Sequence, residues 1–176
     1  MKKALLIVGC VIAVLLLIGI LVMPIGAKTA IEAAKTAAAK TDANNLRVSV
    51  LSFLAEYRSF PFEVEPEKQI KSEPYLMNIL MATKASEENP REIVFYSGRP
   101  ARVEAGAPVH GVHSDGADNY SLYDPWGSLF RVVFDSDDDN RIAHPFSGAS
   151  IGARVLVWSP GPDGIDGTDD DVKSWE

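Results

Sequence analysis

The chain opens with an unbroken run of apolar residues from Ala4 to Ile25. A helix of about 20 such residues is long enough to cross the hydrocarbon core of a bilayer. Lys2 and Lys3 precede the run, and short positively charged N-termini stay on the cytoplasmic side of a membrane. The pattern therefore predicts an uncleaved transmembrane anchor over residues 1–27, with the rest of the chain outside the cytoplasm.

Two alternatives compete with the anchor. A cleaved signal peptide would have a shorter apolar core and a small residue at the position where Ile25 stands before a cut after Ala27. A lipoprotein signal is suggested by the Ile-Val-Gly-Cys sequence that ends at Cys10, but few apolar residues precede it and many follow. Cys10 is the only cysteine, so no disulfide can form within the chain.

A helical pattern follows the apolar run. Residues from Lys28 to Lys40 are rich in alanine with spaced lysines and a glutamate, a composition of high helix propensity. Further on, apolar residues recur at helical spacing and form a stripe that must pack against something: Leu46, Val50, Phe53, Leu54 and Tyr57. Pro61 disfavours helical geometry in the residue before it. The pattern predicts a helical extension over residues 28–60, ending at Phe60.

The rest of the chain, residues 61–176, predicts a small α+β head. Pro74–Met81 has proline in its first turn and apolar residues on one side, as a short helix would. Stretches rich in β-branched and aromatic residues predict strands: Glu92–Ser97, Leu129–Phe134 and Ala153–Trp158. Residues 98–119 lack periodicity and predict a long, mobile loop. The expected fold is a long N-terminal helix packed on a small antiparallel sheet.

Charge is concentrated in two places. The chain of 176 residues has a net charge of −7, and nine aspartates lie in residues 135–139 and 163–171. Without these nine aspartates the net charge would be +2. No basic stripe with interleaved aromatic residues is present, so nucleic acid is not an expected partner.

The segment 158–175 is the first candidate metal site. Glycine and proline recur through it and should fold it tightly, which crowds five carboxylates: Asp163, Asp166, Asp169, Asp170 and Asp171. Crowded like charges cost free energy unless a cation lies among them. Calcium suits such a site best, because it accepts a flexible shell of 6–8 oxygens. The alternative is a solvated acidic tail.

A second, weaker metal candidate is the run from Asp135 to Ile142. Asp135, Asp137 and Asp139 have the 1, 3, 5 spacing of an EF-hand calcium loop. Asn140 stands at the sixth position, where a left-handed conformation is needed and asparagine tolerates it. Phe146 occupies the twelfth position, where such loops carry a bidentate glutamate. The alternative is a charged hairpin turn.

Catalytic patterns are weak. His110 and His113 could begin a zinc site, but no cysteine completes it and nothing fixes them on a rigid element. A Gly-x-Ser-x-Gly nucleophile elbow is absent from the sequence. A metal hydrolase is the remaining enzymatic hypothesis, and the sequence favours a protein that is not an enzyme.

Several of these pieces together resemble a known family. The helix is expected to end in Tyr-Arg-Ser-Phe-Pro (Tyr57–Pro61), Asp-Pro-Trp-Gly (Asp124–Gly127) precedes a strand, and Ser-Pro-Gly-Pro-Asp-Gly (Ser159–Gly164) leads to Asp171 and Trp175. This combination resembles the G-type major pseudopilins of type II secretion systems, in the bacterial type IV pilin-like superfamily. The resemblance implies a pilin-like fold, a calcium-stabilised C-terminal loop, and self-association or contact with other pseudopilin or secretion-platform subunits. It also implies a single-pass protein of the bacterial cytoplasmic membrane with a periplasmic head.

The resemblance extends to particular site residues. It implies that Ser159 and Asp163 begin the calcium loop and that Asp169, Asp170 and Asp171 form its acidic end, with Asp163, Asp169 and Asp171 favoured over Asp166 and Asp170. The prepilin cleavage motif of the family is missing, because Lys2, Lys3 and Ile7 stand where its Gly, Phe and Glu would be. The departure favours an alternative function, an anchored calcium-binding periplasmic or surface module that does not enter a filament.

Overall fold

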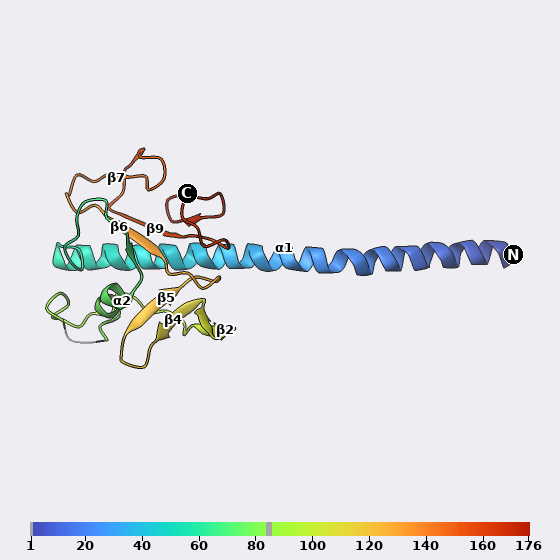
Figure 1. Ribbon diagram of the computed structural model, residues 1–176, viewed down its shortest axis with the longest axis horizontal. Helices are drawn as coiled ribbons and strands as arrows, with labels where there is room; N and C mark the ends of the chain where they lie inside the picture. The colour runs from blue at the N-terminus through green and yellow to red at the C-terminus, as the bar shows by residue number, and fades with distance from the viewer. Residues whose placement is uncertain (1, 84–85) are drawn as a thin grey trace. The chain divides into compact units, whose positions relative to one another are not determined.

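The computed structural model describes the backbone of residues 2–83 and 86–176 and, within these ranges, the side chains from Thr29 onward. The chain divides into two units, Met1–Lys35 and Thr36–Glu176. Helix α1 (Lys2–Tyr57) accounts for the described part of the first unit and continues into the second. The second unit, which we call the head, holds the end of α1 and the other described elements (Figure 1).

The last five turns of α1 bury one face in the head. Leu46, Val50 and Phe53 of the predicted stripe are buried, while Leu54 and Tyr57 are partly buried. The prediction that the helix reaches Phe60 is wrong by three residues. Arg58 adopts a left-handed φ of 60° and its N–H donates to the carbonyl of Leu54 at 2.9 Å, a local helix stop that precedes the proline.

The main sheet of the head has four antiparallel strands in the order β1-β6-β9-β10. They are β1 (Ile70–Lys71), β6 (Arg131–Phe134), β9 (Val155–Ser159) and β10 (Val172–Lys173). Every residue of β9 is buried. Val132 of β6 and Val157 of β9 are directly opposite in the register, and both belong to the core that contains the buried face of α1. The predicted strands over 129–134 and 153–158 are confirmed with shifted ends.

Three two-stranded ribbons complete the strands described. They pair β2 (Arg102–Glu104) with β3 (Ala107–Val109), β4 (Gly111–Ser114) with β5 (Tyr120–Tyr123), and β7 (Ile142–Ala143) with β8 (Ser150–Ile151). The prediction of a structureless loop over 98–119 is therefore wrong, because three of these strands lie in it. Their alanine, glycine and proline content hides the period-2 alternation on which a strand prediction depends.

The prediction of a strand over Glu92–Ser97 is also wrong, because the segment is not a strand. The segment is irregular, begins with a left-handed φ of 51° at Glu92, and joins none of the described sheets. The N–H groups of Phe95 and Tyr96 both donate to the carbonyl of Leu80, at 2.8 and 2.9 Å. Leu80 belongs to helix α2 (Pro74–Met81), which lies where the sequence predicted a short helix. The head is thus α+β, with small antiparallel sheets packed on one long helix.

The structure does not test the membrane anchor. Where side chains are described, in residues 29–83 and 86–176, no helix is both long enough and apolar enough to cross a bilayer. The predicted span, Ala4–Ile25, lies outside those side chains, so the anchor over residues 1–27 remains a prediction.

Candidate metal centre

The C-terminal acidic loop is folded tightly against the sheet. Gly161, Gly164 and Gly167 all have positive φ, between 67° and 93°, and turn the chain between β9 and β10. Trp158 and Trp175 at the two ends of the loop pack edge to face, with ring centroids 5.9 Å apart. Lys40 of α1 donates a hydrogen bond to the carbonyl of Lys173, which ties β10 to the helix.

Asp166 faces the sheet and is already paired. Its Oδ1 accepts a hydrogen bond from the indole N–H of Trp158 at 3.0 Å. Its Oδ2 accepts one from Nε of Arg131 at 3.1 Å, which compensates its negative charge. Asp166 therefore serves mainly to hold the loop on the sheet.

Of three other predicted ligands, Asp163 and Asp169 are exposed and Asp170 is partly buried. Asp163 Oδ1 accepts the N–H of Ile165 at 2.8 Å. Asp170 accepts the hydroxyl of Thr168 on Oδ1 at 2.5 Å and the N–H of Asp163 on Oδ2 at 3.2 Å. The Thr168 hydroxyl lowers the pKa of Asp170. Asp169 is exposed.

Asp171 is the buried member of the group, with 8% of the residue exposed. Its Oδ2 accepts the N–H of Gly167 at 2.8 Å. Its Oδ1 is shielded from water and has no hydrogen-bond partner among the described residues. Burial, and then the nearby charges of Asp166 and Asp170, raise the pKa of Asp171. A proton or a cation would stabilise a carboxylate oxygen in this position.

Ser159 has a different environment from the one expected. The residue is fully buried, and its Oγ donates to Oδ2 of Asp124 at 2.5 Å and accepts the N–H of Gly161 at 3.1 Å. The hydroxyl thus joins the start of the acidic loop to the Asp124–Gly127 turn.

Asp124 is the residue that the candidate sites predicted from sequence lack, although it belongs to the Asp-Pro-Trp-Gly motif of the resemblance. It is fully buried, and its Oδ1 accepts the N–H groups of Trp126 and Ser128, both at 2.9 Å. Burial raises the pKa of Asp124, against the hydrogen bonds that lower it, of which that from Ser159 is the largest. Aspartate before proline is a known turn-former, but no local signal points to Ser159, which lies 35 residues away.

The close approach of the loop to itself gives a testable prediction at Gly161. A Cβ there would lie 2.4 Å from the carbonyl oxygen of Asp170, whereas at Gly164 the nearest atom would be Ser128 Oγ at 3.7 Å. Both glycines have φ near 70°, so alanine costs roughly 1 kcal/mol at either position for the backbone conformation alone. We expect Gly161→Ala to cost about 2 kcal/mol and Gly164→Ala about 1 kcal/mol in chemical denaturation. Equal costs at the two positions would contradict the contact between Gly161 and Asp170.

The second candidate is more compact. Ligand atoms of Asp135, Asp137 and Asp139 lie within 4.8 Å of one another, and within the described part of the chain no other group of three such side chains is this close. Asn140 has the left-handed φ, 63°, that its place in an EF-hand-type loop requires. Ile142, two residues further on, is buried in β7. These three carboxylates could hold a metal ion.

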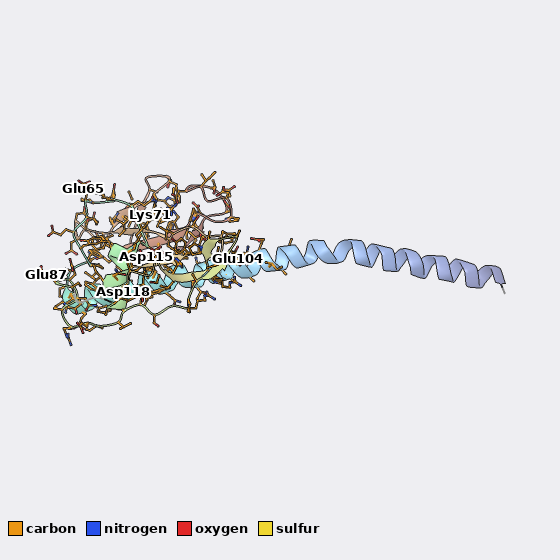
Figure 2. The ribbon with its side chains drawn as sticks, turned by 60° about the horizontal axis from the view of Figure 1, so that its bottom comes forward. Glu65, Lys71, Glu87, Glu104, Asp115 and Asp118 are labelled. Atoms are coloured by element: carbon orange, nitrogen blue, oxygen red, sulfur yellow. The ribbon has the colours of Figure 1, made fainter. Side chains whose placement is uncertain are left out.

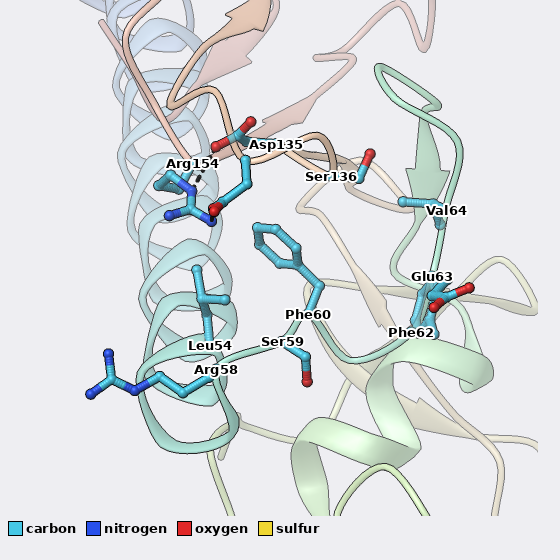
Figure 3. Close-up of a pocket in the computed structure, with 11 residues that line it drawn as sticks. Leu54, Arg58, Ser59, Phe60, Phe62, Glu63, Val64, Asp135, Ser136 and Arg154 are labelled. Atoms are coloured by element: carbon cyan, nitrogen blue, oxygen red, sulfur yellow. Dashed lines mark hydrogen bonds and ion pairs between the residues drawn. The ribbon is translucent and has the colours of Figure 1, made fainter.

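Asp135 is also paired with an arginine, Arg154, near the end of α1. Its Oδ2 lies 2.6 Å from Nε of Arg154, and Arg154 also pairs with Asp138. The guanidinium lies 5.7 Å from the ring centroid of Phe60. Asp135, Arg154 and Phe60 line a pocket of about 540 Å³ beside the end of α1, and Figure 3 shows them around it. Arg154 therefore already compensates the most buried charge of the turn, and a cation would share Asp135 with it.

The two candidates differ in what they lack. The turn at 135–139 brings three carboxylates together, but its buried member is paired with Arg154. The C-terminal loop spreads its carboxylates further apart and leaves one buried oxygen, Asp171 Oδ1, without a partner. Comparison of the chain with protein-family models, with curated proteins and with solved structures gave no match in any of the three.

Proposed function

We propose that this protein is a membrane-anchored, pseudopilin-like structural component of a type II secretion or pilus-type assembly. The observation that carries the proposal is the two-sided character of α1 within the head. One face is buried in the core through Leu46, Val50 and Phe53. The opposite face is exposed and carries small or medium side chains at alternating spacings of four and three: Thr41, Asn45, Val48, Ser52 and Ala55. Such a surface allows a second helix to approach closely.

A second observation supports the resemblance to pseudopilins. Two of its short motifs, Asp124–Gly127 and Ser159–Gly164, are far apart in the sequence but joined in space by the hydrogen bond between Ser159 and Asp124. The connection is buried, so the two motifs work as one structural unit. This explains why both occur in the same chain.

Calcium is the metal that we propose for the C-terminal loop. The free Oδ1 of Asp171 supports it, because a buried carboxylate oxygen without a partner is stabilised by a cation. Asp163, Asp169 and Asp170 would supply further oxygens, and Ser159 and Asp166 would support the loop. When bound, the ion would act structurally, by compensating the charge of Asp171 and holding the loop against the sheet.

The alternative function is an anchored calcium-binding module that acts as a monomer. The missing cleavage motif favours it, because Lys2, Lys3 and Ile7 stand in place of the residues that the family's peptidase and subunit register require. It shares the anchor and the calcium loop with the first proposal. The two differ only in whether α1 contacts other subunits.

A photo-crosslinking amino acid at single exposed positions separates the two functions in native membranes. Val48 on α1 is 53% exposed and Val103 on β2 is 65% exposed, so the two positions are matched in accessibility. Assembly through α1 predicts a ladder of multimers from position 48 and little from position 103. Monomers from both positions would favour the module, and equal ladders from both would indicate association that does not use the helix.

A further inference from the structure

His110 occupies an unusual position between two ribbons of the head. It links β3 to β4 with a left-handed φ of 56°, which is costly for a residue other than glycine. Its backbone N–H donates to the carbonyl of Asp124 at 2.7 Å. Only 13% of its side chain is exposed. The backbone thus holds the imidazole in a largely buried place despite the conformational cost.

The contacts of the ring fit its neutral form. Nδ1 of His110 lies 3.4 Å from Nη2 of Arg102, the first residue of β2. Because a guanidinium can only donate, Nδ1 accepts and the ring proton is on Nε2. Nε2 is shielded from water and has no hydrogen-bond partner among the described residues. The nearest anion is Asp42 of α1, whose Oδ2 is 3.7 Å away.

The charged groups around the ring act in opposite directions. Arg99 donates from Nη2 to both oxygens of Asp42, at 3.0 and 3.3 Å. Asp42, the anion that would stabilise an imidazolium, is therefore already paired with Arg99. Burial, followed by the charge of Arg99, lowers the pKa of His110; Asp42 and, more weakly, Asp124 raise it, and Arg102 lowers it further. Tyr96 is another titratable group near Asp42 and Arg99, and burial and Asp42 raise its pKa, so it remains a neutral phenol.

We propose that His110 is a proton-operated latch for the ribbon β2–β3. In the neutral form its Nδ1 accepts from Arg102 and fastens β2 to the head. Protonation places a second ring N–H against the guanidinium, which removes the acceptor and adds charge repulsion, so Arg102 is released. The imidazolium then interacts with Asp42 of α1, whose Oδ2 is 3.7 Å from its Nε2.

The ribbon is built so that it can detach. β2 and β3 have three residues each, and all three residues of β2 are exposed. Two-stranded ribbons of this size are marginally stable without other contacts. Arg102 has a second partner when released, because Glu104 Oε1 lies 3.7 Å from its Nη2. Figure 2 shows Glu104 labelled on this ribbon. Backbone bonds between Arg99, Ala101 and Val112 hold the base of the ribbon independently of His110.

The direction of the pH effect follows from Arg102, whose charge lowers the pKa of His110 while the latch is closed. A histidine whose pKa is lower in the latched form than in the released form binds fewer protons when latched. The latch is therefore fully stable above the pKa of the released form. It weakens as the pH falls from there toward the lower pKa of the latched form. Release is favoured by up to about tenfold for each unit that separates the two pKa values.

Amide hydrogen exchange of the full chain in detergent micelles tests the latch. Exchange rates for residues 102–109 are measured at pH 7.5 and pH 5.5 and corrected for the intrinsic pH dependence of exchange. His110→Asn is the matched control, because asparagine keeps an acceptor near the Nδ1 position, tolerates the left-handed conformation and does not titrate. Arg102→Ala removes the other partner of the latch.

We expect the protection of residues 102–109 to fall at pH 5.5 in the wild type and to stay constant in His110→Asn. Arg102→Ala should already show the low protection at pH 7.5. Protection of β6 and β9 should be unchanged in all three proteins, which separates release of the ribbon from general unfolding. The proposal is overturned if His110→Asn responds to pH as the wild type does, or if Arg102→Ala leaves protection at pH 7.5 unaltered.

Discussion

Replacing Asp124 with alanine is expected to destabilise the head by about 3–5 kcal/mol, since each buried donor left without a partner costs about 1–3 kcal/mol. Three donors lose their acceptor: the N–H groups of Trp126 and Ser128 and the hydroxyl of Ser159. All lie close to a carboxylate that is fully buried. Such a loss is a large fraction of the 5–15 kcal/mol that stabilises a typical domain.

Urea unfolding of the full chain in detergent micelles, followed by tryptophan fluorescence, measures this loss, because all three tryptophans lie in the head. Asp115→Ala is the matched control. Asp115 also accepts from nearby groups, Ala117 N–H and Asn119 Nδ2, but it is exposed, so water replaces the lost acceptor. The control should cost less than about 1 kcal/mol. Equal losses in the two variants would contradict the structural role of Asp124.

Asp124→Asn should be much milder than Asp124→Ala. The amide keeps an acceptor for the two N–H groups, and the hydroxyl of Ser159 can rotate to accept from the new NH₂ group. Burial raises the pKa of Asp124, so the folded state binds a proton more readily than the unfolded state. That contribution to stability is present at low pH and is lost as the pH rises through the raised pKa. Asparagine does not titrate, which offsets part of its cost at neutral pH.

The elements predicted correctly from the sequence are those whose buried residues recur at a regular spacing along the chain. The stripe from Leu46 to Tyr57 and the short helix over 74–81 were predicted because helical spacing of apolar residues is a local signal. The ribbons over 102–123 were not predicted, since alanine and glycine give no alternation. The irregular segment over 92–97 shows the opposite error: its residues favour a strand, but a strand also requires a partner strand.

For the C-terminal acidic loop, only the residue composition could be used to predict the site, not the contacts of each residue. Glycines and aspartates in residues 160–171 indicated a folded acidic loop, and its glycines do turn the chain. Which carboxylate is buried, however, depends on contacts with distant residues. Asp166 is paired because Arg131 and Trp158 lie beneath it, and Asp171 is the buried one because the chain re-enters the sheet at Val172. The role of Ser159 was likewise decided by Asp124, which is remote in sequence.

Calcium is expected to raise the thermal stability of the full chain, and magnesium much less, because the loop is irregular and suits a flexible oxygen shell. A ligand that binds only the folded state at 100 times its dissociation constant adds about 2.7 kcal/mol, and at 1,000 times about 4.1 kcal/mol. Melting of the head in calcium, in magnesium and in chelator measures the effect. A solvated acidic tail would show no selective response.

Asp171→Asn is the variant that should abolish the calcium response. It removes the charge from the buried carboxylate whose Oδ1 has no partner, while an amide can still accept the N–H of Gly167. In chelator the variant should be as stable as the wild type or more so, because Asp166 and Asp170 no longer face a third negative charge. A general loss of stability in chelator would instead point to a damaged loop.

Two matched substitutions locate the ion. Asp137→Asn changes the turn at 135–139 and should leave the calcium response intact if the ion is held by the C-terminal loop. Asp166→Asn weakens the tie to Arg131 and should lower stability equally with and without calcium. If Asp137→Asn abolishes the response and Asp171→Asn does not, the three clustered carboxylates of the turn hold the ion.

The pH dependence of the response separates the metal site from a merely protonated carboxyl group. The pKa of Asp171 is raised, so without metal the folded state favours the protonated acid, and this contribution to stability is lost as the pH rises through that pKa. A metal ligand must be ionised. The stabilisation by calcium should therefore grow from pH 5 to pH 7.5, as calcium replaces the proton at Asp171. A response that is constant across this range would mean that Asp171 is not a ligand.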